Sequence, residues 1–448
     1  MAAATDLPLI RNYNADSVFA YRRGIAISAT HFLADVNELV RRLPGASHIV
    51  NLCSDRYHFA VGFAAALLRR QINLLPPNQT PAVLEQLVRA YPGAYCLLDS
   101  ETESASLRTV KFPELSSTPS ADFDVPLLPA TQVAAILLTS GSTGQPVPHE
   151  KSWGGMVRSV LAELERLDLA QKSAAGILGT VPPQHMYGLE STVLLPMQGG
   201  LALHAARPFY PADVRAYLEG MSRPRALVTT PVHLRALLAE NVALPRLDFL
   251  ICATAPLSPQ LAAAAEAGFA APLYEVYGCT EAGELAMRRT VETAEWQTLP
   301  GIAFRQDEKG TWARGGNVDA EVLLNDVIEL HDASRFLLHG RNADLVNIAG
   351  KRTSIANLNY HLNSIEGVRD GVFVMPEEQG ETVTRLMAFV VAPGVTRKAL
   401  MQALRSRIDA AFLPRPLHLV ASLPRNTTGK LPREALDTLL AELSGEDE

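Results

Sequence analysis

A segment that could bind phosphate groups follows a short apolar run of the chain. Val133 to Leu138 is apolar throughout and predicts a buried strand. Directly after it come Thr139, Ser140, Gly141, Ser142, Thr143 and Gly144. Hydroxyl and backbone N–H groups can donate to an anion, and glycine lets the backbone approach that anion closely. A plain surface turn can have the same composition, but the position after a strand favours a phosphate-binding loop.

Three further groups of polar residues follow in order along the chain. They are Tyr277-Gly278-Cys279-Thr280-Glu281, then Asp326 with Gly340-Arg341-Asn342-Ala343-Asp344, and then Thr428-Gly429-Lys430. Together with the first loop, they resemble the motifs of the acyl-adenylate-forming superfamily, which includes acyl- and aryl-CoA ligases, adenylation domains of peptide synthetases and luciferases. The similarity covers essentially the whole chain. Four short motifs in the right order are far more specific than any one of them alone.

The resemblance implies that residues 139–144 hold the β- and γ-phosphates of ATP. Members of the superfamily commonly have a lysine after the proline of this loop. Here Val147 follows Pro146, and the next lysine is Lys151. Two alternatives follow: the loop works through N–H and hydroxyl groups alone, or Lys151 reaches back to supply the positive charge.

The second motif implies the contacts of the adenine base and of a magnesium ion. Tyr277, followed by Gly278, would stack on the base. Thr280 would bond the α-phosphate, and Glu281 would bind Mg²⁺, which prefers oxygen ligands and takes few of them from protein. The turn that would cover the other face of the base is formed by Thr254, Ala255 and Pro256.

Two aspartates compete for the role of ribose ligand. Asp326 lies where the superfamily has a carboxylate that accepts both ribose hydroxyls, and its spacing to Arg341 supports this assignment. Asp332 is the competing candidate. Arg341 would contact the ribose and the phosphates with its forked guanidinium group.

The resemblance also implies a mobile C-terminal domain. Asp344 corresponds to the hinge, a position that only has to absorb a change of backbone dihedral angles. Lys430 corresponds to the catalytic lysine, whose ammonium group would bridge the carboxylate of the acid and the α-phosphate. We therefore expect an N-terminal ATP- and acid-binding domain at 1–340 and a mobile C-terminal domain at 341–448.

The segment Pro182-Pro183-Gln184-His185-Met186-Tyr187-Gly188 resembles the part of the superfamily that lines the acyl pocket and the thiol channel. His185 is a candidate catalytic and substrate-contacting residue, expected to act as an aromatic gate and not as a general base. Tyr187 is expected to face the acyl group. Thr230 is a third candidate for contact with the acid.

The remaining sequence predicts the class α/β, with a large N-terminal domain of doubly wound subdomains. Strands are expected at 48–52, 73–75, 95–98, 175–181, 201–204, 226–229, 249–253 and 274–276, and helices at 31–43, 59–70, 81–91 and 231–240. Residues 100–130 predict an exposed connector, and 290–340 a small β unit. Strands at 371–375, 386–391 and 416–420 and a helix at 397–410 predict a small α+β C-terminal domain.

Composition narrows the class of protein further. The 448 residues are 48% hydrophobic and 19% charged, as in a globular enzyme of two or three domains. The net charge of −7 argues against a nucleic-acid partner. Neither a signal peptide nor a membrane span of about 18 apolar residues is expected. The four cysteines form no paired motif, which favours a reducing, cytoplasmic setting. The composition, rich in Ala, Leu and Arg, favours a bacterial source.

The leading functional hypothesis is an ATP-dependent acid–thiol ligase that uses ATP and Mg²⁺. It would adenylate a small carboxylic acid and transfer the acyl group to the pantetheine thiol of CoA or of a holo acyl carrier protein. The resemblance to compact bacterial ligases favours an aryl acid such as a hydroxybenzoate. Two alternatives stay open: an amino-acid adenylation enzyme, although residues 228–233 contain no acid to bind an amine, and a degenerate nucleotide-binding homologue without activity.

Overall fold

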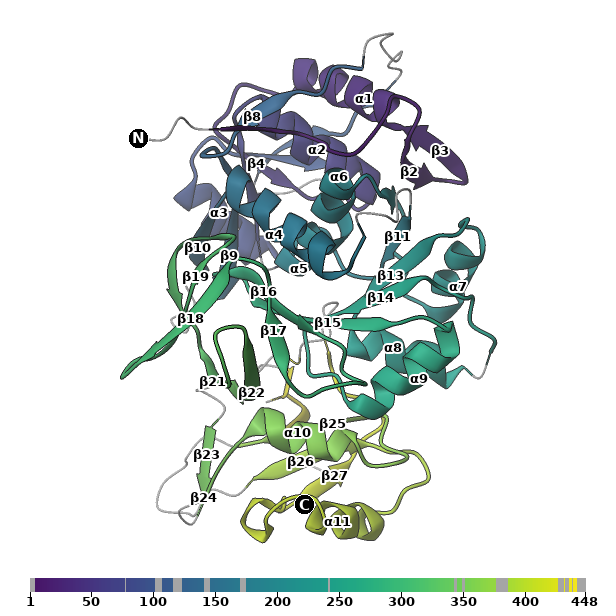
Figure 1. The fold of residues 1–448 in the computed structure, drawn as a ribbon, viewed down its shortest axis with the longest axis vertical. Helices are drawn as coiled ribbons and strands as arrows, with labels where there is room; N and C mark the ends of the chain where they lie inside the picture. The colour runs from purple at the N-terminus through teal and green to yellow at the C-terminus, as the bar shows by residue number, and fades with distance from the viewer. Residues whose placement is uncertain are drawn as a thin grey trace.

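A computed structural model gives the fold. It describes residues 5–76, 78–100, 107–115, 123–140, 146–169, 175–240, 242–341, 345–348, 351–375 and 386–425, together with 431, 435–436 and 438–440. Figure 1 shows a large part that runs from the N-terminus to β22 and a smaller part that carries β23 to β27. None of the described helices has the length and apolar character that crossing a membrane would need.

The first sheet of the large part has six strands. Their order is β10 (Pro146–Ser152), β9 (Val133–Ser140), β5 (Ile72–Leu75), β4 (His48–Asn51), β6 (Tyr95–Leu98) and β7 (Arg108–Lys111). All neighbours are parallel except β10, which pairs antiparallel with β9. The helices that connect its first strands are α1 (Ala29–Arg42), α2 (Arg56–Leu68) and α3 (Pro81–Ala90).

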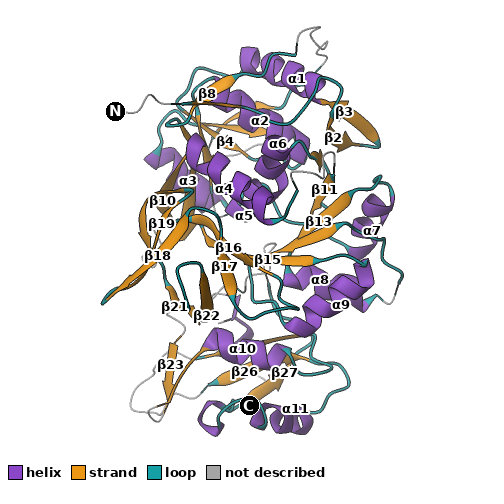
Figure 2. Ribbon diagram, in the orientation of Figure 1, coloured by secondary structure: helices purple, strands orange, loops and turns teal. Residues whose placement is uncertain are grey.

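The second sheet has eleven strands, and its centre is parallel. The parallel strands are, in order, β15 (Leu273–Cys279), β14 (Phe249–Cys252), β13 (Arg225–Thr229), β11 (Gly176–Gly179), β12 (Ala202–His204) and β2 (Val18–Arg22). Antiparallel strands extend both ends: β3 (Ile25–Ser28) beyond β2, and β16 (Gly283–Arg288), β17 (Trp296–Thr298), β22 (Arg335–Arg341) and β21 (Asp326–Leu330) beyond β15. Figure 2 shows helices packed on both sides of these strands.

Further helices connect the strands of the second sheet. They are α4 (Trp153–Arg166), α5 (Met186–Leu189), a π-helical turn (Glu190–Leu194), α6 (Leu195–Gly199), α7 (Pro211–Glu219), α8 (Pro231–Ala239) and α9 (Pro259–Phe269). Short strands β1 (Asp6–Pro8) and β8 (Leu127–Pro129) pair with each other, and β18 (Ile302–Asp307), β19 (Gly310–Gly315) and β20 (Val318–Leu323) form a separate antiparallel sheet.

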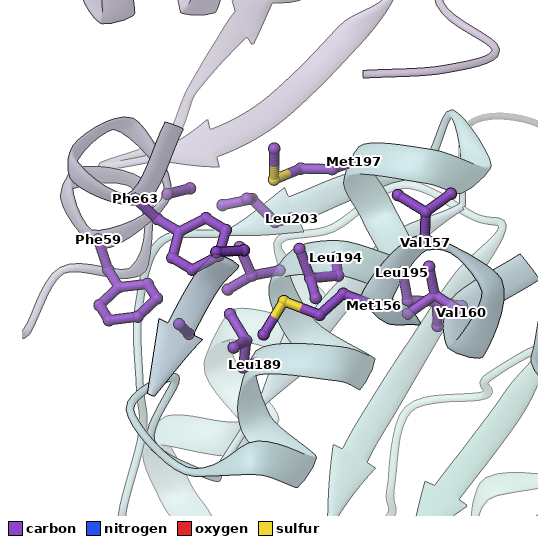
Figure 3. Packing of buried hydrophobic residues seen from close by; sticks show 14 of the residues in the cluster. Phe59, Phe63, Met156, Val157, Val160, Leu189, Leu194, Leu195, Met197 and Leu203 are labelled. Carbon is purple, nitrogen blue, oxygen red and sulfur yellow. The ribbon is translucent and has the colours of Figure 1, made fainter. Parts of the chain in front are cut away.

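The largest core lies between the two sheets. Figure 3 shows Phe59 and Phe63 of α2 facing Leu189 of α5 and side chains of α4 and α6. Helix α2 is buried almost all round because its sequence from Phe59 to Leu68 is apolar without a polar face, the pattern expected of an interior helix. This core fixes the two sheets relative to each other and therefore the strand ends that carry the candidate site.

The C-terminal part has its own core. It consists of the hairpin β23 (Leu345–Ile348) and β24 (Lys351–Ser354), helix α10 (Ile355–Asn363), the sheet β25 (Asp370–Val374), β26 (Met387–Val391) and β27 (Leu417–Leu419), and helix α11 (Arg397–Arg405). Its buried side chains, among them Leu358, Phe373 and Leu400, form a cluster separate from those of the large part.

The class α/β with a small α+β C-terminal part is confirmed. The expected connector at 100–130 is wrong in its described portion: β7 completes the first sheet, and Leu107, Phe112 and Leu128 are buried. The short, partly polar strands in this region give no clear periodicity. Pairing with β6 decides the structure of β7, and pairing with β1 that of β8. The predicted helix at 397–410 ends at Arg405. The boundary at 340/341 stays a prediction.

Candidate nucleotide and acid site

The hydroxyl group of Tyr277 donates a hydrogen bond to Asp326. Tyr277 lies on β15, Asp326 begins β21, and Tyr277 Oη is 2.9 Å from Asp326 Oδ2. Only 7% of Tyr277 is exposed, because its ring packs against Trp296 and Phe336 with ring centroids 5.7 Å away in each case. The aromatic side chains of β17 and β22 therefore hold both the ring and the carboxylate in fixed positions.

The competing aspartate, Asp332, caps a turn. It lies in the exposed connection between β21 and β22, where one carboxylate oxygen accepts the backbone N–H groups of Ser334 and Arg335, each at 2.8 Å. Its other oxygen lies 2.7 Å from the Arg335 Nε atom. These local contacts explain Asp332 without a ligand. They leave Asp326, beside Tyr277, as the better ribose candidate.

The backbone at the end of β22 lies beside Asp326, the partner of Tyr277. Asp326 and Arg341 stand opposite each other in the antiparallel ladder of β21 and β22. The side chain of Arg341, and the predicted residues Asp344 and Lys430, lie outside the described part of the chain. The same holds for Gly141, Ser142, Thr143 and Gly144 and for the side chain of Ser140, whose backbone pairs with Pro146.

A strained turn follows β14. Thr254 has a φ of 82°, a left-handed conformation that is unusual for a β-branched residue. Such a conformation costs on the order of 1–3 kcal/mol and is concentrated at functional sites. Ala255, half-buried, and Pro256, exposed, continue the turn. The turn lies at the carboxyl end of the strand next to β15, which is where the sequence places the second wall of the base site.

The Glu281 loop joins β15 to β16, and its shape depends on Gly278. The ladder is irregular between Tyr277 and Gly278. A Cβ atom at Gly278 would lie 2.4 Å from the carbonyl oxygen of Gly283, so no other residue fits without a shift of the backbone. Thr280 and Glu281 are both half-buried at the tip. Burial raises the pKa of the Cys279 thiol to about 12, so at neutral pH this cysteine is protonated and is not an activated nucleophile.

Lys151 is directed at the Glu281 loop. Its Nζ atom donates to the backbone carbonyl oxygen of Glu281 at 2.5 Å. Burial lowers the pKa of Lys151, and the charge of Glu190 is the largest of the opposing effects. The lysine that could have replaced the missing cation of the phosphate loop thus holds the backbone of the predicted magnesium ligand.

The hairpin of β9 and β10 brings a histidine to the phosphate side. Val147 stands opposite Thr139 in the ladder and is 43% exposed. His149, two residues further along β10, has its Nε2 atom 3.1 Å from Thr139 Oγ1. Burial lowers the pKa of His149, and the Glu281 charge partly opposes this. Sequence reasoning missed His149. The sequence could have indicated it, because Val147, His149 and Lys151 are spaced two residues apart and must share one face of a strand.

The predicted acid pocket lies at the carboxyl ends of β13 and β14. The hydroxyl group of Tyr187 donates to the carbonyl oxygens of Thr229 and Ile251, at 3.0 and 3.1 Å. Burial raises the pKa of this hydroxyl well above its usual value, so it stays protonated. Because the hydroxyl group donates to backbone carbonyl oxygens, the ring is the part of Tyr187 that could face an acyl group.

Thr230 and His185 border the same strand ends. Thr230 caps α8, and its Oγ1 lies 3.1 Å from His233 Nδ1, which is also 3.0 Å from Thr180 Oγ1. Burial lowers the pKa of His233, which is therefore neutral at neutral pH. His185 is half-buried at the start of α5. Sequence reasoning missed His233, since nothing in its local pattern separates it from a core histidine.

The residues present fit a magnesium ion bound with the nucleotide. The described residues contain no group of three or more His, Cys, Asp or Glu side chains arranged around an ion. Mg²⁺ usually takes one or two protein carboxylates and fills its other positions with phosphate oxygens and water. Glu281 is suited to this, because its carboxylate forms no ion pair within the described part of the chain and its loop is contacted by Lys151 of β10.

Residues 45–308 match the family described as AMP-binding enzyme, and the chain belongs to this family. It is 27% identical over 314 residues to a 4-coumarate–CoA ligase of Rhodobacter capsulatus, covering 69% of this chain and 77% of that protein. It is 22% identical over 331 residues to a 2-succinylbenzoate–CoA ligase of Staphylococcus epidermidis, covering 67% and 69%.

Solved structures share the fold over nearly the whole chain. ATP-bound MatB from Rhodopseudomonas palustris superimposes with a TM-score of 0.79 at 17% identity, covering 96% of this chain and 97% of that one. The O-succinylbenzoate coenzyme A synthetase of Bacillus subtilis, in complex with AMP, gives 0.76 at 17% identity, covering 94% and 95%. With the family and its ligase relatives, this protein is an AMP-forming acid–thiol ligase.

Proposed function

We propose that the protein activates a small aromatic carboxylic acid with ATP and transfers the aryl group to a pantetheine thiol. The observation that carries the proposal is the convergence of three features at one edge of the second sheet. They are the Tyr277–Asp326 pair, the Glu281 loop held by Lys151, and the strand ends that carry Tyr187 and Thr230. Base and ribose recognition, a magnesium carboxylate and an acid pocket would thus adjoin one another.

The first step would join the acid to AMP. A carboxylate oxygen attacks the α-phosphorus of ATP, a P–O bond forms, and the bond to the β-phosphate breaks with release of pyrophosphate. The protein contributes mainly by orienting the reactants and stabilising the charge that develops on phosphorus. Thr280 would donate to the α-phosphate, and Lys430 would bridge it to the carboxylate. Mg²⁺ bound by Glu281 would neutralise charge on the phosphate oxygens.

The second step would form the thioester. The pantetheine sulfur attacks the carbonyl carbon of the aryl-adenylate, and AMP leaves with the electrons of the C–O bond. We assign Lys430 to a C-terminal domain of residues 341–448 that rotates about Asp344, so that the lysine acts in the first step and withdraws before the second. Movement about a hinge is a common way to divide two reactions between two arrangements of one site.

The preference for an aromatic acid is the finer part of the proposal. The relatives named above are ligases of 4-coumarate and 2-succinylbenzoate, and both of these acids contain a benzene ring. In this chain, Tyr187 is fixed by its hydroxyl group, so its ring would offer a rigid wall for a flat substrate. An aromatic ring prefers an offset or edge contact with such a wall.

ATP–pyrophosphate exchange with a panel of acids tests the proposal. Benzoates and cinnamates should support exchange well above long-chain fatty acids and amino acids. Exchange with amino acids alone would instead favour an amino-acid adenylation enzyme. Absence of exchange with every acid, in a folded protein that still binds ATP, would favour a homologue without activity. Equal exchange with benzoates and with long-chain acids would overturn the aromatic preference.

A further inference from the structure

An ionic contact at α8 joins the large part of the molecule to the C-terminal part. The Nη1 atom of Arg235, on α8, lies 3.9 Å from the Oδ1 atom of Asp370, the first residue of β25. Both side chains are mostly buried, with 21% of Arg235 and 17% of Asp370 exposed. Within the described part of the chain, Asp370 is the only carboxylate at ion-pair distance from Arg235. Because the two residues belong to different parts, their contact depends on how the parts are arranged.

The same carboxylate binds the segment that leads to Lys430. Arg425 has its Nε atom 2.6 Å from Asp370 Oδ2 and its Nη2 atom 2.9 Å from Asp370 Oδ1. This is the paired, charge-assisted geometry that an arginine forms with a carboxylate. The Oδ1 atom of Asp370 therefore lies between Arg425 and Arg235. Asp370 connects α8 with a residue five positions before Lys430.

The three side chains together carry one excess positive charge. Burial lowers the pKa of Arg235, the charge of Asp370 opposes this, and the charge of Arg425 adds to it. Two guanidinium groups that share a poorly solvated place repel each other unless a carboxylate lies between them. The negative charge of Asp370 is therefore what allows the C-terminal part to lie against α8 at this point.

The two contacts of Asp370 respond differently to a rotation of the C-terminal part. Asp370 lies on β25, and Arg425 follows β27 of the same sheet, so their contact moves with that part. Arg235 stays with α8, which packs against α9 in the large part. A rotation about the predicted hinge therefore breaks the contact with Arg235 and keeps the contact with Arg425.

A contact near the predicted hinge does not have this property. The hydroxyl group of Ser354 donates to the carbonyl oxygen of His339 on β22. These residues lie shortly after and shortly before Asp344 in the chain, so a rotation there moves them little relative to each other. Figure 1 shows α8 at a different place from β22 along the edge of the large part that faces the C-terminal part. The pair of Arg235 and Asp370 is thus suited to distinguish two arrangements.

Chain lengths indicate which reaction step this arrangement serves. Arg235 lies five residues after Thr230, which caps α8 at the acid pocket, so about 7.5 Å separates them along the helix axis. Lys430 lies five residues after Arg425, and five residues span at most about 17 Å. Because both arginines contact Asp370, the acid pocket lies within the reach of Lys430. Joining the acid to AMP requires this proximity.

We propose that Asp370 is a positioning residue for adenylation, and that its contact with Arg235 latches the C-terminal part in the arrangement that brings Lys430 to the acid. The inference rests on the proposed function for the roles of Lys430 and the hinge. After adenylation the latch opens, and Asp370 moves away from α8 while still bound to Arg425. A single partly buried ion pair suits this role, because it biases an equilibrium between two arrangements and can still be broken in every cycle.

Arg235→Met tests the latch, because methionine removes the charge and is well tolerated in a helix. ATP–pyrophosphate exchange should fall about threefold to tenfold, since the latched arrangement becomes less populated. Thioester formation from a preformed aryl-adenylate should stay as in the parent. Arg235→Lys, which keeps the charge, should retain most of the exchange. The matched control is Arg215→Met on α7, where the arginine pairs with Glu219 of the same helix.

Asp370→Asn completes a double-mutant cycle with Arg235→Met. Asparagine has nearly the same size but lacks the charge that binds both arginines, so exchange should fall further than in Arg235→Met. Adding Arg235→Met to Asp370→Asn should cause no further loss, because the contact is already absent. Losses that multiply independently, an equal loss of thioester formation in Arg235→Met, or unchanged exchange in that variant would each overturn the latch.

A distance measurement makes the test independent of activity. Spin labels can be attached at Ala216→Cys on α7 and Lys398→Cys on α11, since both positions are exposed, whereas the native cysteines are buried or, at Cys279, half-buried. Arg235→Met should shift part of the population to a second distance between the labels, and an unchanged distribution would overturn the latch. If the parent supports no exchange with any acid, the proposed function fails, while the distances still decide whether Arg235 holds the C-terminal part.

Discussion

The predicted base and ribose side of the nucleotide site differs in construction from the predicted phosphate side. Tyr277 and Asp326 are joined by a hydrogen bond and supported by the rings of Trp296 and Phe336, so they are in place before any ligand arrives. On the phosphate side, Val147 occupies the position of a cation, and Lys151 is turned to the backbone of Glu281. The comparison indicates that the groups predicted to bind adenosine are held by one another, whereas Lys151, the next lysine after the predicted phosphate loop, contacts a backbone carbonyl oxygen.

The difference follows from where the side chains originate. Tyr277 and Asp326 lie on two strands of one sheet, and the rings of Trp296 and Phe336, on strands between them, pack against Tyr277. The phosphate side combines the β9–β10 hairpin of the first sheet with the Glu281 loop of the second. A contact between two sheets, such as that of Lys151 with Glu281, is then needed to hold the loop. The following predictions test this contrast, from the largest effect to the smallest.

Lys430→Ala should lower the rate of adenylation by roughly 10²–10³, because one preorganised group that stabilises developing charge is lost. Folding, and thioester formation from a preformed aryl-adenylate, should change little. The measurement is ATP–pyrophosphate exchange beside a thermal melt. Lys398→Ala, on the exposed face of α11, is the matched control. Near-normal exchange in the Lys430 variant would show that this lysine does not act in adenylation.

Asp326→Asn should raise the KM for ATP by about tenfold, since a hydrogen bond to a charged acceptor is worth roughly 1.5–3 kcal/mol. Asp332→Asn should leave this KM unchanged, because its contacts are confined to the turn between β21 and β22. Steady-state kinetics with ATP and with 2′-deoxy-ATP provide the measurement. If the Asp332 variant shows the larger rise, the assignment of the ribose ligand is reversed.

Lys151→Met should weaken the use of magnesium without removing any predicted ligand. The contact with the Glu281 carbonyl oxygen would be lost, and the loop would be less well held. We expect the magnesium concentration for half-maximal exchange to rise a few-fold, and more in Glu281→Gln, because an amide is a poorer ligand than a carboxylate. If the magnesium dependence stays the same while the KM for ATP rises, Lys151 acts on the phosphates directly.

Val147→Lys should have the smallest effect, a decrease of a few-fold in the KM for ATP. Val147 is exposed on the strand face that carries His149, so a lysine there fits without repacking. Its charge would strengthen contacts with phosphate, because charge-assisted hydrogen bonds are about twice as strong as neutral ones. Val147→Met, which is long but neutral, is the control. Identical KM values for the parent and both variants would place this end of the hairpin away from the nucleotide.

The pH dependence of stability tests whether His149 is buried in the β9–β10 hairpin. Burial lowers the pKa of His149, so the unfolded chain binds its proton at a higher pH than the folded protein. Stability should therefore fall as the pH drops below about 6.5, the usual value for histidine, and His149→Gln should reduce this fall. Thermal melts between pH 5 and pH 8 measure it, and an unchanged profile in the variant would show that His149 titrates as an exposed group.

The sequence by itself determined the class of fold and the order of the site motifs. Short apolar runs, such as Val133 to Leu138, predict buried strands. The polar residues that follow such a run must then lie at the end of the strand. The 139–144 loop could be proposed on that basis, whereas Glu281 was assigned through the resemblance of its motif to the superfamily. The requirement for glycine at position 278 is local as well, since it arises from the close approach of Gly283 within one hairpin.

Only the tertiary structure decided between partners that are far apart in the chain. Asp326 and Asp332 are equivalent as isolated acids, and the pairing of β21 with β22 set one beside Tyr277 and the other at a turn. The same applies to Lys151, whose contact with the backbone of Glu281 joins the first sheet to a loop of the second. Periodicity reports whether a side chain is buried. Which residues then meet depends on the order and register of the strands, and these are set by packing of the whole chain.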